Sequence, residues 1–259
     1  MRDLLDDLAG EHASLDDLVA PLDAEAWETP TPAAGWTVVD CVAHVSFFDG
    51  TAALAATDAE AFRRDAESLM ADPSRLAAVH ERAHDLGGPV LLEEWRSARH
   101  GLLAAFDGLD PSTRLPWYGP PMSAKSFVTA RLMETWAHGE DVADALGVRR
   151  EPTDRLRHVA QIGWRARPFS YRIRGLEPPE GEVFVSLDGP GGQVELGDPS
   201  SPDRITGPLL DFCLVVTQRR LAQDTALVAA GPLAEEWLPI AQAFAGGPTT
   251  TDPARAQSA

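Results

Sequence analysis

Apolar residues recur every three or four positions along four long stretches of the chain. This spacing places them on one face of an α-helix. It predicts four long amphipathic helices, over about residues 2–21, 37–57, 89–107 and 123–147. Residues 58–88 are less regular, and we expect only a short helix there, between Pro73 and Gly87. Four long helices joined by connections of moderate length indicate a helical bundle.

Capping signals support the ends of two of these helices. Ser123 is a favourable N-cap for the last of them, and Gly147 stands where a glycine commonly ends a helix. Thr37, with Asp40 three residues later, forms an approximate capping box at the start of the second helix. Local side-chain chemistry therefore agrees with the apolar spacing.

The pattern changes after the last of these helices. Another helix is expected over about residues 153–167, followed by a proline- and glycine-rich turn at residues 175–181. EVFVSLDG and QVELG alternate between apolar and polar residues on either side of GPGG, which predicts a β-hairpin. Farther along we expect a buried helix in ITGPLLDFCLVVTQRRL, a strand in TALVAAG and a final helix in PLAEEWLPIAQAFAG.

These elements predict an α+β protein of two domains. We expect an N-terminal four-helix bundle over residues 1–168 and a smaller C-terminal α+β domain over residues 169–246. Residues 247–259 are polar and proline-containing, and we expect them to be disordered.

The charge balance argues against polyanionic partners. The chain holds 22 basic and 40 acidic residues, a formal net charge of −18, so its surface repels nucleic acid phosphates and anionic membranes. Adjacent basic residues occur only in pairs, such as Arg149-Arg150 and Arg219-Arg220, which are too small to line a nucleic-acid groove. We therefore expect neither nucleic acid nor a membrane as a partner.

Other features of composition favour a cytoplasmic protein. The acidic, amphipathic N-terminus lacks the basic start and apolar run of a secretory signal, and no apolar run approaches the length of a membrane span. Cys41 and Cys213 are too few for a disulfide framework. Lys125 is the only lysine, while alanine, glycine and proline are plentiful, a composition typical of a GC-rich genome.

Two residues of the helix over 123–147 could bind one metal ion. Glu134 and His138 are four residues apart, so both side chains project from one face of the helix. An exposed polar pair would have the same spacing. Two ligands cannot close a tetrahedral site, so a metal site needs a third donor from another helix. His44 lies within the apolar run of the second helix, and a buried histidine needs a partner.

Two segments together resemble a known family. WTVVDCVAHVSFFD at residues 36–49 and LMETWAHGEDVADALG at residues 132–147 look like the signature helices of the mycothiol-dependent maleylpyruvate isomerase family, which is part of the DinB-like metal-binding bundles. The resemblance covers nearly the whole chain. It implies a DinB-like four-helix bundle in an actinobacterial protein and a metal triad of His44, Glu134 and His138. The paired motif is specific for the fold and the triad and says little about the substrate.

The ligand set suits a catalytic transition metal. Two imidazoles and one carboxylate suit zinc by default, with nickel or another divalent transition metal as alternatives, and three protein ligands leave one position open. An open zinc site can activate a water or bind a thiol as its thiolate. The resemblance implies the thiol route, with mycothiol as cosubstrate. The thiol would add to a small, carboxylated electrophile and then stay, as in an S-transferase, or leave after bond rotation, as in a cis–trans isomerase.

Two other functions stay open at this point. Metal-bound water in place of the thiol would make the protein a hydrolase. A metal- or ligand-binding module with the same fold would leave the open position for sensing or sequestration. The expected partners are a small substrate and a low-molecular-weight thiol, and the oligomeric state is a monomer or a homodimer.

Several side chains near the triad could assist it. Asp141, one turn beyond His138, and Asp40, one turn before His44, could orient the imidazoles, although Asp40 could instead cap its helix and Asp141 could face solvent. Cys41 could be a fourth ligand, which would close the site, but a small buried apolar side chain is the favoured role.

Two further pairs could contact the substrate. Trp117 and Tyr118, in the loop that leads into the helix over 123–147, could line the mouth of a pocket, whereas Trp136 is expected in the core. The resemblance implies that an arginine of the second domain reaches the active site, and Arg219 or Arg220 could bind a substrate carboxylate there. The same arginines could instead stabilise the C-terminal end of a helix.

A second motif matches a different class of metal site. His80-Glu81-Arg82-Ala83-His84 spells H-E-x-x-H, the signature of zinc proteases. Gly87 fits the longer metzincin pattern, but Val90 stands where that pattern requires a histidine. The segment also lacks the long apolar backing of a protease active-site helix. We therefore interpret it as a solvated helix face, or at most a peripheral metal site.

Overall fold

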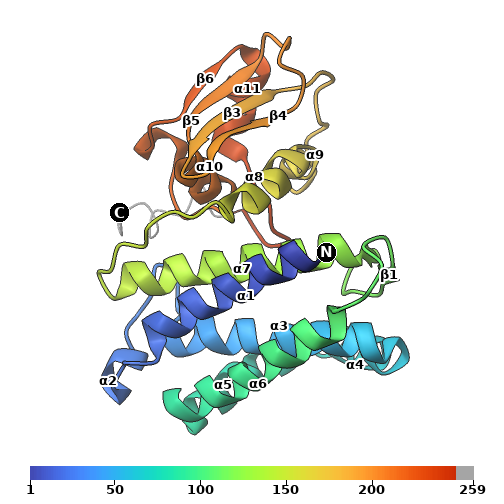
Figure 1. Cartoon of the computed structure of the whole chain (residues 1–259), viewed down its shortest axis with the longest axis vertical. Helices are drawn as coiled ribbons and strands as arrows, with labels where there is room; N and C mark the ends of the chain where they lie inside the picture. Colours follow the sequence, from blue (N-terminus) through green and yellow to red (C-terminus); the bar gives the residue numbers. More distant parts are fainter. Residues whose placement is uncertain (249–259) are drawn as a thin grey trace. The chain divides into compact units, whose positions relative to one another are not determined.

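The computed structural model describes residues 1–248 and falls into two compact units, Met1–Arg149 and the residues from Arg150 onward. The helices of the first unit are α1 (Arg2–Val19), α2 (Ala24–Trp27), α3 (Val38–Thr57), α4 (Ala59–Ala71), α5 (Ser74–Leu86), α6 (Gly88–Phe106) and α7 (Ala124–Ala145). The four longest, α1, α3, α6 and α7, form a bundle in which α1 and α3 each pack against both α6 and α7 (Figure 1). The predicted four-helix bundle is confirmed.

Helix α3 supplies much of the bundle core. By length and composition α3 could cross a membrane, and it is the one such helix within residues 1–248. However, 61% of its apolar window is buried inside the protein. Its side chains pack with apolar residues of the neighbouring helices, among them Leu15, Leu91 and Trp95. The hydropathy of α3 is therefore that of a core helix.

The expected capping signals are present. Thr37 and Asp40 form a complete capping box at the start of α3. The Ser123 hydroxyl accepts a hydrogen bond from the Ser126 amide at the start of α7. After α7, Gly147 has a φ of 64°, a left-handed conformation that costs glycine little. Two-residue strands β1 (Arg114–Leu115) and β2 (Met122–Ser123) pair antiparallel just before α7.

The expected helix between Pro73 and Gly87 is confirmed as α5, but the expectation that the rest of residues 58–88 is irregular was wrong. This stretch forms two regular helices, α4 and α5, of 13 residues each. Asp58 caps α4 by accepting a hydrogen bond from the Ala61 amide. Each helix buries a single side chain, Phe62 in α4 and Ala83 in α5. Because so few positions are buried, the apolar pattern of both helices is weak.

The second unit combines a small mixed sheet with short helices. Its elements are α8 (Leu156–Arg165), α9 (Arg167–Arg172), β3 (Phe184–Gly189), β4 (Gly192–Leu196), β5 (Arg204–Pro208), α10 (Leu209–Val216), β6 (Val228–Ala230), α11 (Pro232–Trp237) and two 3-10 turns, Ala222–Asp224 and Leu238–Ile240. The strand order is β4-β3-β5-β6, with β3 and β5 parallel and the other pairs antiparallel. The predicted hairpin is β3-β4, and the α+β class is confirmed.

Three details of the second unit differ from the expectations. The segment ITGP lies in strand β5, and the helix begins only after Pro208, which cannot donate a backbone hydrogen bond. The final helix ends at Trp237, before Pro239. The two units divide after Arg149 and not after residue 168, because α8 packs on α10 of the second unit. The tail expected to be disordered, residues 247–259, lies mostly outside the described residues.

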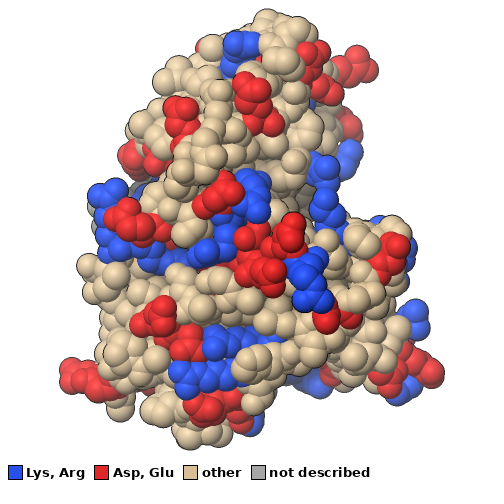
Figure 2. All heavy atoms as spheres, viewed as in Figure 1, with Lys and Arg blue, Asp and Glu red and all other residues tan. Residues whose placement is uncertain are grey.

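Charged side chains of both signs share the molecular surface. On the face drawn in Figure 2, patches of basic side chains border acidic ones in each unit. Among the ion pairs of the first unit, Arg96 contacts both Asp16 and Glu93. Basic groups on that face therefore lie among carboxylates.

Candidate metal centre

Three residues from two packed helices bring their ligand atoms together. His44 comes from α3, and Glu134 and His138 come from α7. Oε2 of Glu134 lies 3.7 Å from Nε2 of His44 and also 3.7 Å from Nε2 of His138. One ligand atom from each residue lies within 4.8 Å of the other two. The fold thus supplies the third donor that the pair on α7 lacks.

The spacing of these atoms fits a shared cation. Direct hydrogen bonds between nitrogen and oxygen are about 2.7–3.2 Å long, so 3.7 Å is too long for one. Ligand atoms around a tetrahedral zinc ion, with bonds of about 2.0–2.2 Å, lie about 3.4 Å apart. The side chains of His44, Glu134 and His138 are 18%, 27% and 10% exposed. Each of the three side chains therefore keeps some contact with solvent.

Burial and neighbouring charge set the protonation states of the three residues. Burial lowers the pKa of His44 to about 4, so its imidazole is neutral and its lone pair is free at neutral pH. Burial opposes ionisation of Glu134, but attraction to the His138 and His44 imidazoles holds its pKa well below its usual value. Burial also opposes protonation of His138, but interactions with Asp141, Cys41 and Glu134 raise its pKa well above the usual value. A metal ion would therefore displace a proton from His138.

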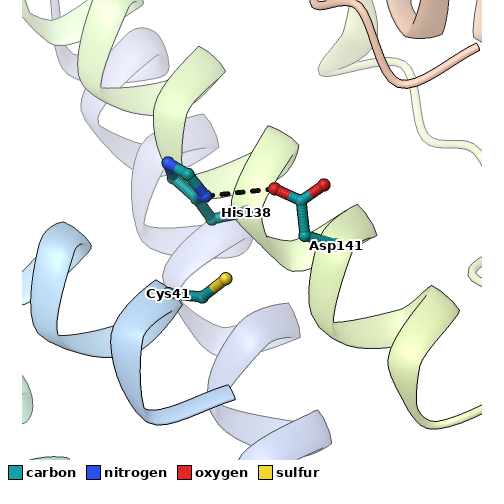
Figure 3. A group of neighbouring side chains, drawn as sticks. All are labelled: Cys41, His138 and Asp141. Atoms are coloured by element: carbon teal, nitrogen blue, oxygen red, sulfur yellow. Dashed lines mark hydrogen bonds and ion pairs between the residues drawn. The ribbon is translucent and has the colours of Figure 1, made fainter. Parts of the chain in front are cut away.

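The other side of the His138 ring faces a carboxylate and a thiol. Nδ1 of His138 lies 3.2 Å from Oδ2 of Asp141, which is fully buried, and the side chain of Cys41 lies near the same ring (Figure 3). When Nδ1 of His138 carries the proton and donates a hydrogen bond to Asp141, Nε2 presents its lone pair to Glu134 and His44. Among the described residues, Cys41, His138 and Asp141 are the other group that could hold a metal ion. The two groups share His138.

Asp40 has partners other than the triad. Its Oδ2 accepts hydrogen bonds from the backbone amide and hydroxyl of Thr37, at 2.8 and 3.0 Å. Its Oδ1 lies 2.8 Å from Nδ1 of His80 and 3.3 Å from Nε2 of His84. Nδ1 of His44 has no hydrogen-bond partner among the described residues. Asp40 therefore caps α3 and does not orient His44.

Both histidines of the H-E-x-x-H motif contact Asp40. His80 and His84 lie on α5, and both converge on one oxygen of Asp40. His84 also reaches Glu28, at 3.1 Å. The two histidines are not part of either potential metal group within residues 1–248. The motif thus joins α5 to the start of α3.

Trp36 is a site residue that the sequence analysis missed. Its ring stacks on the His138 ring at a centroid distance of 5.4 Å and an interplanar angle of 18°. It also contacts the rings of His44 and His80, at 5.1 and 4.8 Å. The sequence offered one signal for this role, because Trp36 directly precedes Thr37, the N-cap of α3. The loop that leads into α3 places the Trp36 ring beside the triad.

An aromatic cluster extends from the triad to the expected pocket residues. The Phe48 ring lies 4.6 Å from the His44 ring. The rings of Trp117 and Tyr118 lie 5.9 and 5.7 Å from that of Phe48. One aromatic ring therefore separates both residues from His44. Trp136 is buried in the core, as expected.

The comparisons with known proteins agree with this geometry. The sequence model described as the mycothiol maleylpyruvate isomerase N-terminal domain matches residues 8–143. The chain belongs to this family. The match includes α3 and the part of α7 that carries Glu134 and His138. The resemblance of the two helical motifs is therefore confirmed.

Two relatives and two crystal structures extend the likeness beyond the bundle. The uncharacterized proteins MT0041 and Rv0036c of two Mycobacterium tuberculosis strains are each 44% identical over 246 residues, 93% of this chain and 95% of each relative. The crystal structures of mycothiol-dependent maleylpyruvate isomerase and of a histidine-to-alanine mutant of it match with a TM-score of 0.60 at 15% identity, over 90% of this chain and 95% of theirs. At this identity the structural match shows the fold of both units.

The two expected arginines lie in the second unit. They follow α10, directly after Gln218, which has a φ of 60° and is the one residue other than glycine with a positive φ within residues 1–248. Arg219 donates a hydrogen bond to the carbonyl of Thr217 at 2.7 Å, and Arg220 donates to the carbonyl of Arg219 at 2.8 Å. A role for either arginine in substrate binding stays a prediction.

Proposed function

We propose that the protein is a zinc-dependent enzyme that uses mycothiol, or a similar low-molecular-weight thiol, on a small carboxylated electrophile. The reaction is cis–trans isomerisation or S-transfer. One observation carries the proposal. The side chains of His44, Glu134 and His138 form a partly exposed group in which Oε2 of Glu134 lies 3.7 Å from Nε2 of each histidine. Membership of the mycothiol maleylpyruvate isomerase family supports the choice of a thiol.

The chain's own residues would prepare the site. His44 is neutral and Glu134 is ionised, so both can act as ligands without a change of protonation. Asp141 would hold the proton on Nδ1 of His138 and leave Nε2 free. Zinc held by these three residues would keep a thiol sulfur in its nucleophilic thiolate form.

Aromatic and basic side chains of the protein would hold the substrate. Trp117 and Tyr118, with Phe48, would form an apolar wall beside the electrophilic carbons. Arg219 or Arg220 would bind a substrate carboxylate through the guanidinium group. The sulfur adds to one carbon of a conjugated double bond, and the π electrons move to the conjugated carbonyl oxygen. After rotation about the resulting single bond, the electrons return, the C–S bond breaks and the thiol leaves.

Metal analysis of purified variants tests the ligand set. We expect His44→Ala, Glu134→Ala and His138→Ala to lose the bound metal, because two remaining ligands hold zinc weakly. His80→Ala serves as the matched control, because it removes an imidazole that contacts Trp36 and Asp40 but does not belong to the triad. Metal loss in the control with retention in the triad variants would overturn the assignment.

Turnover assays test the thiol. We expect the metal-loaded protein to convert maleylpyruvate, or another small unsaturated carboxylate, only when mycothiol or another thiol is present. Turnover without any thiol would favour a hydrolase. Tight ligand binding without turnover of any substrate would favour a binding module.

A further inference from the structure

A buried polar layer crosses the bundle next to the metal triad. Asp49 of α3 is fully buried and contacts one residue from each of the other three bundle helices. Its Oδ2 lies 3.2 Å from Nε2 of His12 in α1 and 3.0 Å from Nε1 of Trp95 in α6. Its Oδ1 accepts a hydrogen bond from Nε of Arg131 in α7, at 3.0 Å. All four residues are at most 3% exposed.

The carboxylate of Asp49 is charged in this layer. Burial opposes its ionisation, but the charge of Arg131, the nearby imidazole of His12 and the hydrogen bond from Trp95 lower its pKa. A buried ion pair of this kind gives little net stability compared with an apolar replacement, but breaking it leaves an uncompensated charge. Its effect is therefore to penalise every packing in which Asp49 and Arg131 do not meet.

This penalty matters most for the register of α3 against α7. Apolar side chains can pack in more than one axial register, whereas a single buried polar contact selects one. Arg131 contacts α3 at two points, because Nη2 also donates a hydrogen bond to the carbonyl of Val45, at 3.3 Å. Val45 is next to His44, and Arg131 lies three residues before Glu134 on the same side of α7. The register that satisfies Arg131 is thus the one that sets Glu134 opposite His44.

We propose that Asp49 and Arg131 are positioning residues of the metal centre, which lock α3 and α7 in the register that brings His44, Glu134 and His138 together. The proposal rests on the metal triad of the proposed function. Neither residue would touch the metal or the substrate. Both act by holding the two ligand-bearing helices in place.

The test compares Asp49→Asn with the same substitution at another ion-paired aspartate of the bundle. Asp16 of α1 is also buried and pairs with Arg96 and Arg99 of α6, helices that carry no triad residue. Zinc affinity is measured by competition with a chromophoric chelator, and the free energy of unfolding is measured on the metal-free proteins. We expect Asp49→Asn to weaken zinc binding about tenfold to hundredfold, the range found when residues that orient metal ligands are lost. Asp16→Asn should lower stability and leave zinc affinity almost unchanged.

Hydrogen exchange provides a readout that does not need the metal. In metal-free Asp49→Asn we expect faster amide exchange in the facing turns of α3 and α7, around Val45 and Glu134, than in Asp16→Asn. If Asp49→Asn fails to fold, Arg131→Lys replaces it, since lysine keeps the charge but lacks the planar guanidinium fork that bonds Asp49 through Nε and Val45 through Nη2.

Two results would overturn the proposal. One is a loss of zinc affinity in Asp49→Asn no larger than in Asp16→Asn. The other is equal exchange around the triad in the two variants. If the wild-type protein binds no zinc at all, the proposed function fails, and the exchange comparison alone decides whether the polar layer sets the register.

Discussion

Nε2 of His44 on α3 lies 3.7 Å from Oε2 of Glu134 on α7, although most of the bundle separates the two residues in sequence. The distance is too long for a hydrogen bond and suits two ligands of one ion. The pair links the signature segments of the family, and its geometry leads to predictions for the residues around it.

Asp141 should strengthen metal binding through His138. In Asp141→Asn the carboxylate that faces Nδ1 of His138 becomes an amide, so the orientation and basicity of the imidazole are less well controlled. We expect zinc affinity to fall about tenfold to hundredfold while the fold is kept. Chelator competition measures the affinity, and circular dichroism checks the helix content. Unchanged affinity would show that Asp141 plays no part in holding the ligand.

Asp40 should matter for stability and not for the metal. Asp40→Ala removes the capping box of α3 and the shared partner of His80 and His84. Loss of an N-terminal cap costs about 0.5–2 kcal/mol of stability. We expect a lower midpoint of urea unfolding together with an unchanged metal content per folded protein. Loss of metal in this variant would contradict the assignment of Asp40 to capping.

Zinc binding should weaken as the pH falls. The pKa of His138 is raised well above its usual value, so below that pKa the metal must displace a proton, and each further drop in pH lowers the apparent affinity. The pKa of Glu134 is held well below its usual value, and that of His44 is lowered to about 4. Protons therefore compete with the metal for these two ligands only at acidic pH. Competition titrations over a range of pH measure the slope. An affinity that does not change with pH would contradict the raised pKa.

Trp36 should report on the metal centre by fluorescence. Its indole stacks on His138 and contacts His44, so displacement of the His138 proton by zinc changes the surroundings of the ring. We expect zinc to change the tryptophan emission of the wild-type protein and not that of Trp36→Phe. Trp237→Phe, which removes a buried tryptophan of the second unit, should keep the change. A zinc response that survives in Trp36→Phe would place its source elsewhere.

The sequence predicted the elements whose signals are local. The four bundle helices have long apolar faces, and the capping residues Thr37 and Ser123 act on amides within three residues. Glu134 and His138 share a face because of helix geometry alone. Helix α4 was missed because it buries only one side chain.

The polar layer shows where sequence reasoning stops. Asp49 and Arg131 occur in helical segments, where a charged side chain on the surface and one in the core look the same. Nothing near Asp49 in the chain indicates that His12 and Trp95 will surround it. The double contact of Asp40 with His80 and His84 could not be predicted for the same reason.

By itself, the sequence determined which segments are helical, which residues could bind a metal and which family the two motifs resemble. Only the tertiary structure decided that His44 meets Glu134 and His138, that Asp40 caps a helix and that Asp49 and Arg131 are paired in the core. The physical reason is the separation along the chain of the residues that interact. Helix formation depends on neighbours within one or two turns, whereas ligation and buried ion pairing depend on the packing of helices that are far apart in the chain.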